Sequence, residues 1–324
     1  MSLETCPKIS QPNKNLEPVP RQLVETEYFG QLRIDHYKPV IDGIRLHYTE
    51  SGSGTRVIIL GGLPLYVWEG FVGFIKPFSK KHTVNVLEYP GFGESQEVPD
   101  EHNFEMVTET LHQVIQQEGL GPAHIAALSF GAGTAIYLAA KHPEDVRSLS
   151  LMGVPIEFNP LIREKRSFLK HPAISQIAAK LIGNEKLWPA FFAFLISDPW
   201  PAKNLYGQKW TLRLAKKYAS ISPRAMLEYF HSILATNEED WQKLCQQIKA
   251  PIAIVISRQE AEKERRLQLK GPHTTGIKLK PMLPHAELLI NPDIATPLGH
   301  SKGLPFAQIV LPFLEKIDQR ERKI

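Results

Sequence analysis

The sequence predicts an α/β fold in which a mostly parallel sheet carries helices on both faces and one helical segment is inserted. Four short apolar runs follow one another, at residues 57–60, 84–87, 125–128 and 149–152. Apolar runs of this length are typical of buried parallel strands. Helical patterns lie between them, such as residues 103–117 with Asn103 as the N-cap. Strands that alternate with helices form a parallel sheet covered on both faces.

The two ends of this pattern are also defined by local signals. Residues 32–37 and 44–48 alternate apolar and polar side chains on either side of Asp42-Gly43, which indicates a hairpin and therefore an antiparallel edge. Two further strands are expected at residues 252–256 and 286–290, and a helix at 304–318. These elements complete the sheet and cover it.

The chain divides into three parts by pattern. Residues 1–24 are polar and contain prolines, so we expect an extension outside the fold. Residues 25–154 and 245–324 carry the strand and helix pattern of a core, whereas residues 155–244 show helical patterns without a strand and are predicted to form an inserted cap. Four of the five tryptophans lie in the cap, where they either form its own core or line a pocket: Trp188, Trp200, Trp210 and Trp241.

Composition excludes several classes of protein. The 324 residues carry a formal charge of +4 and no Lys/Arg block interleaved with aromatics, so no nucleic-acid partner is expected. Neither of the two cysteines, Cys6 and Cys245, has metal-site or disulfide spacing, which favours a reducing, cytoplasmic setting. The longest apolar stretch, residues 188–196, is half the ~18 residues that a membrane span needs. We therefore expect no stable membrane anchoring, although a lid that touches lipid is a weaker alternative.

Ser129 is the predicted nucleophile. The apolar run at 125–128 leads directly into Ser129, and a helical sequence follows. A nucleophile on such a sharp turn needs small residues two positions away on either side, and Ala127 and Gly131 meet this need. The turn also directs the Phe130 amide towards an oxygen that becomes negative during the reaction.

Ser301 competes with Ser129, because residues 299–303 match the same small-x-Ser-x-Gly pattern. However, Pro292 and Pro297 separate Ser301 from the last predicted strand, and no histidine follows it to act as the base. Strand context therefore favours Ser129.

Four motifs in order carry a resemblance to a known family. Gly61-Gly62-Leu63-Pro64 precedes Trp68, a glycine-rich loop spans residues 89–95, the Ser129 motif comes third and His142-Pro143 follows the helix. From about residue 40 to 318 the chain resembles the α/β-hydrolase superfamily, in its cap-bearing branch. The resemblance implies an eight-stranded sheet with an inserted helical cap. Two departures stand out, namely Gly61 in place of the usual histidine and Glu88 in place of the usual aspartate.

The resemblance also implies the roles of the site residues. The oxyanion hole would be formed by the backbone N–H groups of Leu63 and Phe130, and His300 would be the general base because it follows the last strand. Two other histidines lie late enough to compete. His285 precedes the last strand, and His273 lies in a Gly-Pro loop with no strand to position it.

The acid of the triad is predicted to be Glu260, which stands where the family places an aspartate after the strand that follows the cap. A glutamate can hold and polarise the imidazole as an aspartate does. Glu157 and Asp293 are the alternatives, and Glu260 could instead be a surface residue within a run of charges.

These residues predict a serine hydrolase that cleaves a small to medium apolar carboxylic ester through an acyl-enzyme. The only partner expected is a small apolar substrate, and the chemistry needs no metal or organic cofactor. The same serine and histidine also fit a carbon–carbon bond hydrolase or an iminopeptidase. A member that binds a ligand without catalysis is the alternative from another class. The sequence does not predict the oligomeric state.

Overall fold

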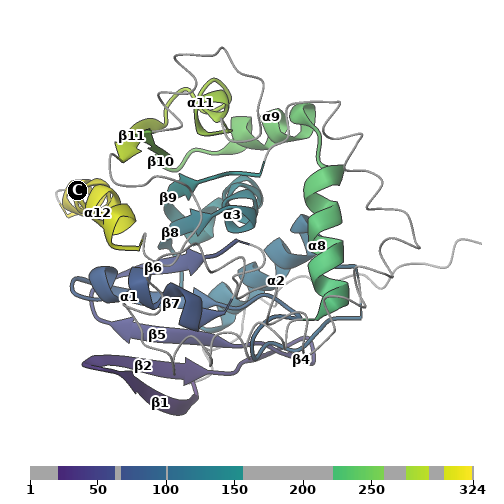
Figure 1. Cartoon of the computed structure of the whole chain (residues 1–324), viewed down its shortest axis with the longest axis vertical. Coiled ribbons are helices and arrows are strands. Elements are labelled where there is room, and N and C mark those ends of the chain that lie inside the picture. The colour runs from purple at the N-terminus through teal and green to yellow at the C-terminus, as the bar shows by residue number, and fades with distance from the viewer. Residues whose placement is uncertain are drawn as a thin grey trace, which may run out of the picture.

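A nine-stranded mixed sheet forms the centre of the fold in the computed structural model, which describes residues 21–62, 67–99, 101–155, 222–258, 275–291 and 303–322. Within these residues the sheet has one strand more than the family resemblance implies. In spatial order its strands are β1 (Leu23–Phe29), β2 (Leu32–Tyr37), β5 (Tyr48–Gly52), β7 (His82–Leu87), β6 (Thr55–Leu60), β8 (Ala123–Leu128), β9 (Val146–Met152), β10 (Ile252–Ser257) and β11 (Glu287–Asn291) (Figure 1).

The parallel part of the sheet confirms the strands expected from the apolar runs. The six strands from β7 to β11 are parallel to one another, whereas β1, β2 and β5 form an antiparallel edge next to β7. In each parallel pair the carboxyl ends lie at the same edge of the sheet, which is where this class of fold binds ligands. The carboxyl ends of β6, β8, β10 and β11 therefore define the edge at which a site is expected.

The antiparallel edge is confirmed, but its pairing differs from a simple hairpin. Asp42 and Gly43 have positive φ values of 48° and 80°, as a tight hairpin turn requires, and join the short strands β3 (Val40–Ile41) and β4 (Ile44–Arg45). Strand β2 instead pairs with β5, with Tyr37 opposite Tyr48. The small hairpin of β3 and β4 therefore lies within the connection between β2 and β5 and forms no part of their pairing.

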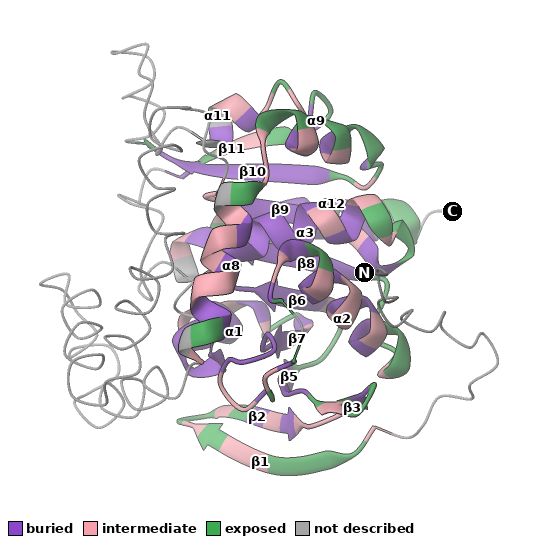
Figure 2. Ribbon diagram, turned by 90° about the vertical axis from the view of Figure 1, so that its right-hand side faces the viewer, coloured by how far each residue is buried: buried purple, intermediate pink, exposed green. Residues whose placement is uncertain are grey.

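Helices cover both faces of the sheet (Figure 1). One face carries α2 (Phe104–Gln117), α3 (Phe130–Lys141), α8 (Pro223–Ala235) and α9 (Glu238–Gln247), and the other carries α1 (Val72–Phe78) and α12 (Gly303–Glu321). Alternate residues of a strand enter different cores: Ile58 and Leu60 pack under α2 and α3, while Val57 and Ile59 pack under α1 and α12. The central strands are buried on both sides (Figure 2). This explains why they appear in the sequence as continuous apolar runs.

Three short helices complete the described elements: η1 (Trp68–Phe71), η2 (Pro143–Asp145) and α11 (Thr275–Leu279). The predicted N-cap of α2 is confirmed, since the Asn103 side chain accepts a hydrogen bond of 2.8 Å from the Met106 amide. None of the helices in the described ranges is long and apolar enough to cross a membrane.

Candidate active site

Ser129 lies on a strained turn between β8 and α3. Its φ of 52° and ψ of −121° are unusual for a residue other than glycine, and such a conformation costs about 1–3 kcal/mol. The Ser129 amide donates a hydrogen bond of 2.9 Å to the Met152 carbonyl at the end of β9, which fixes the turn. Ser129 is partly exposed although Ala127 and Phe130 are buried. The predicted strand, turn and helix around this serine are therefore confirmed.

Glycines allow the end of β6 to approach this turn closely. A Cβ atom added to Gly131 would lie 2.3 Å from the Leu60 carbonyl oxygen, so only glycine fits there. A Cβ atom added to Gly62 would lie 2.5 Å from Ser129 Cβ and 3.1 Å from Ser129 Oγ. The backbone that leads into the predicted oxyanion loop therefore lies against the serine. Leu63, the next residue and the predicted donor, is outside the described residues.

Phe130 holds the turn from the side of the helix. Its amide is the first of α3 and has no acceptor within the helix, so the helix geometry leaves it available to an oxyanion. Its ring is fully buried against three other rings, at centroid distances of 4.5 Å from Phe104, 5.1 Å from Tyr229 and 5.5 Å from Tyr89. This packing keeps the first turn of α3, and hence the amide, in one position.

The glycine that replaces the usual histidine is explained by Phe71. A Cβ atom added to Gly61 would lie 2.1 Å from the Phe71 ring, which is 4% exposed. The ring comes from η1 and fills the volume that a side chain at position 61 would need. The absence of the histidine is visible in the sequence, but no sequence signal identifies the residue that takes its place, because the contact depends on how η1 packs.

We expect Gly61→Ala to destabilise the protein by about 1–3 kcal/mol, because the added methyl group collides with a buried ring. In a Phe71→Leu background the same change should cost at least about 1 kcal/mol less. Urea unfolding of the four proteins in this double-mutant cycle measures the difference. Equal costs in both backgrounds would show that Phe71 does not restrict position 61.

Glu88 connects three segments of the chain, namely the residue before β5, the start of η1 and the glycine-rich loop. Its buried carboxylate accepts hydrogen bonds from His47 Nδ1 at 2.7 Å, the Trp68 amide at 3.1 Å and the Glu94 amide at 2.8 Å. Although burial lowers the pKa of His47, the Glu88 carboxylate raises it above its ordinary value. A Cβ atom at Gly93 would lie 2.1 Å from the same carboxylate. The residue that departs from the family pattern therefore holds both η1 and the glycine-rich loop in place.

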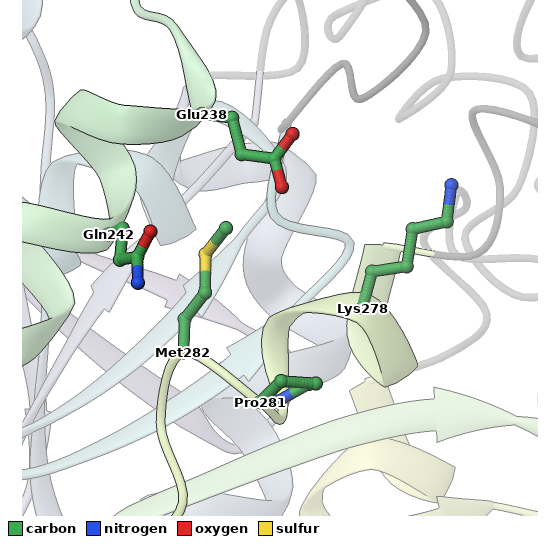
Figure 3. Close-up of a pocket in the computed structure, with 5 residues that line it drawn as sticks. All are labelled: Glu238, Gln242, Lys278, Pro281 and Met282. Carbon is green, nitrogen blue, oxygen red and sulfur yellow. The ribbon is translucent and has the colours of Figure 1, made fainter.

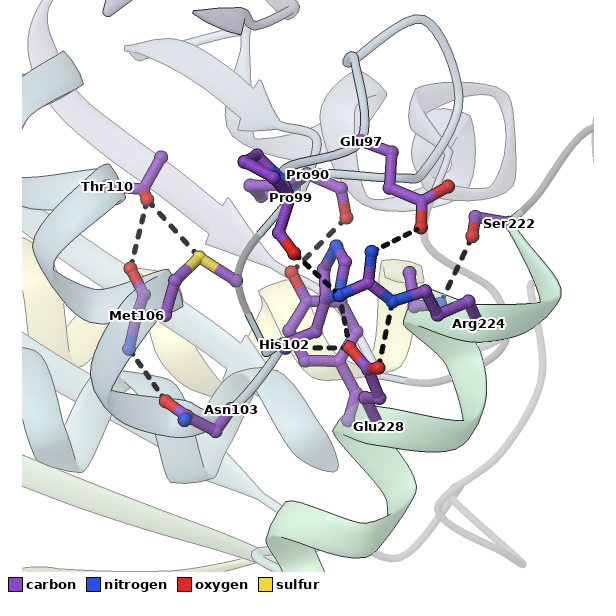
Figure 4. Close-up of polar contacts among 12 residues, drawn as sticks. Pro90, Glu97, Pro99, His102, Asn103, Met106, Thr110, Ser222, Arg224 and Glu228 are labelled. Atoms are coloured by element: carbon purple, nitrogen blue, oxygen red, sulfur yellow. Dashed lines mark hydrogen bonds and ion pairs between the residues drawn. The ribbon is translucent and has the colours of Figure 1, made fainter. Parts of the chain in front are cut away.

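Helix α8 is fixed to the chain that follows β7 by a polar cluster (Figure 4). Glu228 accepts hydrogen bonds from the His102 amide at 3.0 Å, from His102 Nδ1 at 2.7 Å and from Arg224 at 2.9 Å. Burial acts to raise the pKa of Glu228, but these donors hold it below its ordinary value. The Tyr229 hydroxyl donates to the Pro90 carbonyl at 3.2 Å. Because the Tyr229 ring also packs on Phe130, this helix supports the serine turn.

The other predicted triad residues come after strands that end at the Ser129 edge. Strand β10 ends at Ser257 and β11 ends at Asn291, both parallel to β8 and β9. Several residues singled out from the sequence lie outside the described ranges: Glu260, His300, Glu157, Asp293, His273 and Ser301. His285 is exposed and precedes β11, which confirms its expected place at the edge opposite Ser129.

Two cavities on the described surface are lined by residues of α8, α9 and α11. One, of about 440 Å³, is lined by Glu238 and Gln242 of α9 and by Lys278, Pro281 and Met282 near α11 (Figure 3). The other, of about 430 Å³, lies near the end of α8 and includes Glu101, His231 and Asp240. Neither is lined by Ser129 or Phe130.

A second serine, imidazole and carboxylate lie in hydrogen-bonded order at the opposite edge of the sheet. His124 Nδ1 is 2.7 Å from Ser148 Oγ, and His124 Nε2 is 3.1 Å from Asp318 Oδ1. Ser148 is completely buried, so no substrate can reach it. Burial lowers the pKa of His124 to about 4, against the opposing effect of Asp318. The neutral ring can accept from Ser148 and donate to Asp318, which satisfies all three buried groups, so this cluster is structural.

We expect this cluster to make stability fall in mild acid. The folded pKa of His124 is about 4 and its unfolded value is about 6.5, so the unfolded chain binds an extra proton between these values. The stability is complete above about pH 6.5 and decreases by roughly 3 kcal/mol on reaching pH 4. Urea unfolding from pH 7 to 4.5 measures it, with His124→Gln as the comparison. A native slope no steeper than that of the variant would contradict the assignment.

Comparison with known proteins adds to this geometry. A family model for the alpha/beta hydrolase fold matches residues 55–261, more than half of the chain. The chain is 22% identical to a 2-hydroxy-6-oxononadienedioate/2-hydroxy-6-oxononatrienedioate hydrolase of Burkholderia vietnamiensis, covering 84% of this chain and 92% of that relative. It is 22% identical to Lipase 1 of Psychrobacter immobilis, covering 86% and 78%. A thermophilic esterase of Thermogutta terrifontis superposes with a TM-score of 0.65 at 18% identity, covering 87% and 98%. At this identity the structural likeness concerns the fold.

Proposed function

Because the chain belongs to the alpha/beta hydrolase fold family, we propose that it is a serine hydrolase that cleaves a small to medium apolar carboxylic ester through an acyl-enzyme. The observation that carries the proposal is the strained conformation of Ser129 between β8 and α3, with the Gly62 backbone against its side chain. A strained serine at the carboxyl edge of a parallel sheet favours nucleophilic catalysis.

In the proposed reaction, His300 removes the proton from Ser129 Oγ while that oxygen attacks the ester carbonyl. The amides of Phe130 and Leu63 stabilise the negative oxygen of the tetrahedral intermediate. His300 then gives its proton to the departing alcohol, which leaves an acyl group on Ser129. Water, activated by the same histidine, attacks the acyl carbon and releases the acid. Glu260 would orient the imidazole and stabilise its cationic form.

Carbon–carbon bond hydrolysis is the second candidate reaction, because one relative is named for a substrate of that kind. The hydrolase of Burkholderia vietnamiensis is named for a dienedioate that contains no ester, so its hydrolysis breaks a carbon–carbon bond. On the present chain, attack of Ser129 Oγ at the 6-oxo carbonyl would break the bond between carbons 5 and 6. The departing fragment would leave as an enolate and take up the proton held by His300, and water would then release the acyl group from Ser129. Lipase 1 of Psychrobacter immobilis is also 22% identical to this chain, so the comparison supports ester cleavage equally well. The apolar side chains expected in the cap favour the ester.

The nucleophile can be tested directly with a fluorophosphonate probe, which forms a covalent bond with an activated serine. We expect labelling of the native protein and of Ser301→Ala, and none of Ser129→Ala. Absence of labelling in the native protein would favour a ligand-binding protein without catalysis. Loss of labelling in Ser301→Ala alone would move the nucleophile to that residue.

The bond that is cleaved can be decided with two substrates. We expect p-nitrophenyl butyrate to be hydrolysed with a higher kcat/KM than a 2-hydroxy-6-oxo-dienoate, and the reverse order would select the carbon–carbon reaction.

For the acid, Glu260→Gln should lower kcat by orders of magnitude, while Glu157→Gln and Asp293→Asn should not. Near-native turnover of Glu260→Gln would remove Glu260 from the triad.

A further inference from the structure

Two buried histidines form a hydrogen-bonded chain that ends on Glu88. His47, the residue before β5, has its Nδ1 2.7 Å from Glu88 Oε2, and its Nε2 is 3.0 Å from Nδ1 of His36 on β2. His36 Nε2 is in turn 3.8 Å from Glu27 Oε2 on β1. The side chains of His36 and His47 are 5% and 0% exposed. The chain of groups therefore runs from the edge of the sheet to Glu88 with very little contact with solvent.

The two imidazole rings lie side by side and not face to face. Their centroids are 5.2 Å apart, and the angle between their planes is 21°. This separation is close to the N···N distance of 3.0 Å plus the radii of the two rings, so the line that joins the nitrogens passes near both ring centres. The lone pair of an imidazole nitrogen lies in the ring plane and points along that line. One proton therefore lies between the rings, donated by one nitrogen and accepted by the other.

The contacts of the pair require three N–H protons on its four ring nitrogens. Glu88 accepts from two backbone amides as well as from His47, which favours its ionised form and places a proton on His47 Nδ1. The second proton lies between the rings. With these two alone, His36 Nε2 would be a buried lone pair that faces the Glu27 carboxylate, with no hydrogen-bond partner among the described residues. A third proton on that nitrogen replaces the repulsion by an attraction, and two imidazoles with three N–H protons carry one positive charge.

The charges around the pair favour this extra proton. Carboxylates reach it from β1, from η1 and from the chain after β7, and Lys38 is the cation nearest to them, paired with Glu94 at 2.8 Å; these carboxylates belong to Glu25, Glu27, Glu69, Glu88 and Glu94. Burial acts to lower the pKa of both rings, but Glu88 raises the pKa of His47 above its ordinary value, while burial and the charge of His47 leave the pKa of His36 below its own. The positive charge is therefore centred on His47.

Helix η1 is the element that this charge holds in place. The Trp68 amide donates to the Glu88 carboxylate at 3.1 Å, and the Trp68 ring packs edge-on against His36 at a centroid distance of 5.3 Å. Phe71 of the same helix fills the volume beside Gly61, and the residue after Gly61 lies against the side chain of the nucleophile. The position of η1 therefore restricts the backbone that approaches the serine turn.

From this arrangement we infer that His36 and His47 share one positive charge and act through Glu88 as positioning residues for the backbone beside Ser129. The consequence for catalysis rests on the proposed serine hydrolase, whereas the charge and its effect on η1 do not. Loss of the proton would leave His36 Nε2 as a lone pair facing Glu27 and would weaken the attraction that holds Glu88.

The sign of the pH dependence follows from His47. Its folded pKa lies above the ordinary value of 6.5, so the contribution of the charge is complete below about pH 6.5 and is lost as the pH rises through the folded value. The lowered pKa of His36 acts in the opposite direction in acid, so the alkaline side is the one that reports the shared proton.

The charge is tested by NMR on the full-length protein labelled with ¹⁵N at histidine and tryptophan, with His36→Gln and His47→Asn to assign the rings. At pH 6.5 we expect three ring N–H groups in the pair, and two after the proton is lost at alkaline pH. The Trp68 amide proton should shift with the same midpoint, whereas the Trp241 amide, which donates to the Asn237 carbonyl, should not. Two neutral rings at pH 6.5, or a Trp68 amide that does not follow the histidine titration, would overturn the inference.

Kinetics with p-nitrophenyl butyrate test the positioning role on the alkaline side. His47→Asn keeps a donor near the position of Nδ1 but carries no charge, so kcat should fall about tenfold with KM within about twofold, and the alkaline decrease of kcat seen in the native protein should disappear. His36→Gln should act in the same direction, whether or not His47→Asn folds. His285→Asn is the matched control at an exposed histidine and should keep the native profile.

The two sets of results separate this inference from the proposed function. Native kcat and a native alkaline decrease in both His47→Asn and His36→Gln would overturn the positioning role. A native protein that neither hydrolyses the ester nor reacts with the fluorophosphonate would contradict the proposed function, and the NMR titration would still decide whether the pair carries its charge and holds η1.

Discussion

Replacement of Ser129 by alanine is expected to lower kcat/KM for an ester by roughly 10⁴- to 10⁶-fold, because the reaction loses its covalent intermediate. Serine and alanine share the cost of the positive φ at this position, so the Tm of the variant should stay close to the native value. Initial rates with p-nitrophenyl butyrate and a thermal melt measure both quantities. A variant that keeps more than a hundredth of the native rate would show that another residue performs the attack.

Ser129→Gly provides the matched comparison. Glycine adopts positive φ without the steric cost that serine pays, so this variant should be as inactive as Ser129→Ala but more stable by about 1–2 kcal/mol. Neither variant has the hydroxyl group, so the difference between their free energies of unfolding in urea measures the backbone strain at position 129. Equal stability of the two would indicate that the turn is not strained.

The largest loss of stability is expected at Glu88. Its carboxylate is 2% exposed and accepts from His47 and from two backbone amides, so Glu88→Gln leaves a buried imidazole without its charge partner. Removal of one member of a buried pair costs roughly 3–5 kcal/mol. Activity should decrease as well, because the Trp68 amide belongs to the segment that follows the predicted oxyanion loop. Glu88→Asp keeps the charge and should lose less.

Glu105→Gln is the control for this measurement. Glu105 is 70% exposed and pairs with Lys141 at the surface, where such pairs contribute about 0–1 kcal/mol. Urea unfolding at pH 7 compares the two variants with the native protein. If Glu88→Gln costs no more than Glu105→Gln, the buried network has no structural role.

Sequence patterns predicted the parts of the fold that depend on neighbouring residues. The strand, serine and helix around Ser129 are contiguous, so their signals appear in one short segment. Five of the six parallel strands, β6 to β10, are largely buried on both faces and therefore appear as apolar runs, whereas the edge strand β11 is partly exposed. The Asp42-Gly43 turn was also found, because its two positive φ values require these residue types.

Contacts between distant segments could not be predicted in this way. The pairing of β2 with β5 depends on how the sheet packs, and the hairpin signal between them suggested a nearer partner. Glu88 and His47 are 41 positions apart, and no pattern connects them. Phe71 at Gly61 and Tyr229 on Phe130 are packing contacts that only the folded chain reveals. The base and the acid were predicted from chain order and from the family resemblance, which give the strand that each residue follows but not its separation from Ser129.

The attachment of α8 has a consequence for protein engineering. Enzymes with inserted caps invite exchange of the whole insertion to alter substrate range. Here Tyr229 and Glu228, near the end of the predicted insertion, contact Phe130 and His102 of the core. A chimaera with its junction after α8 would discard these anchors, whereas a junction before Ser222 would retain them. Exchange of the segment that precedes Ser222 should therefore leave the support of the serine turn intact.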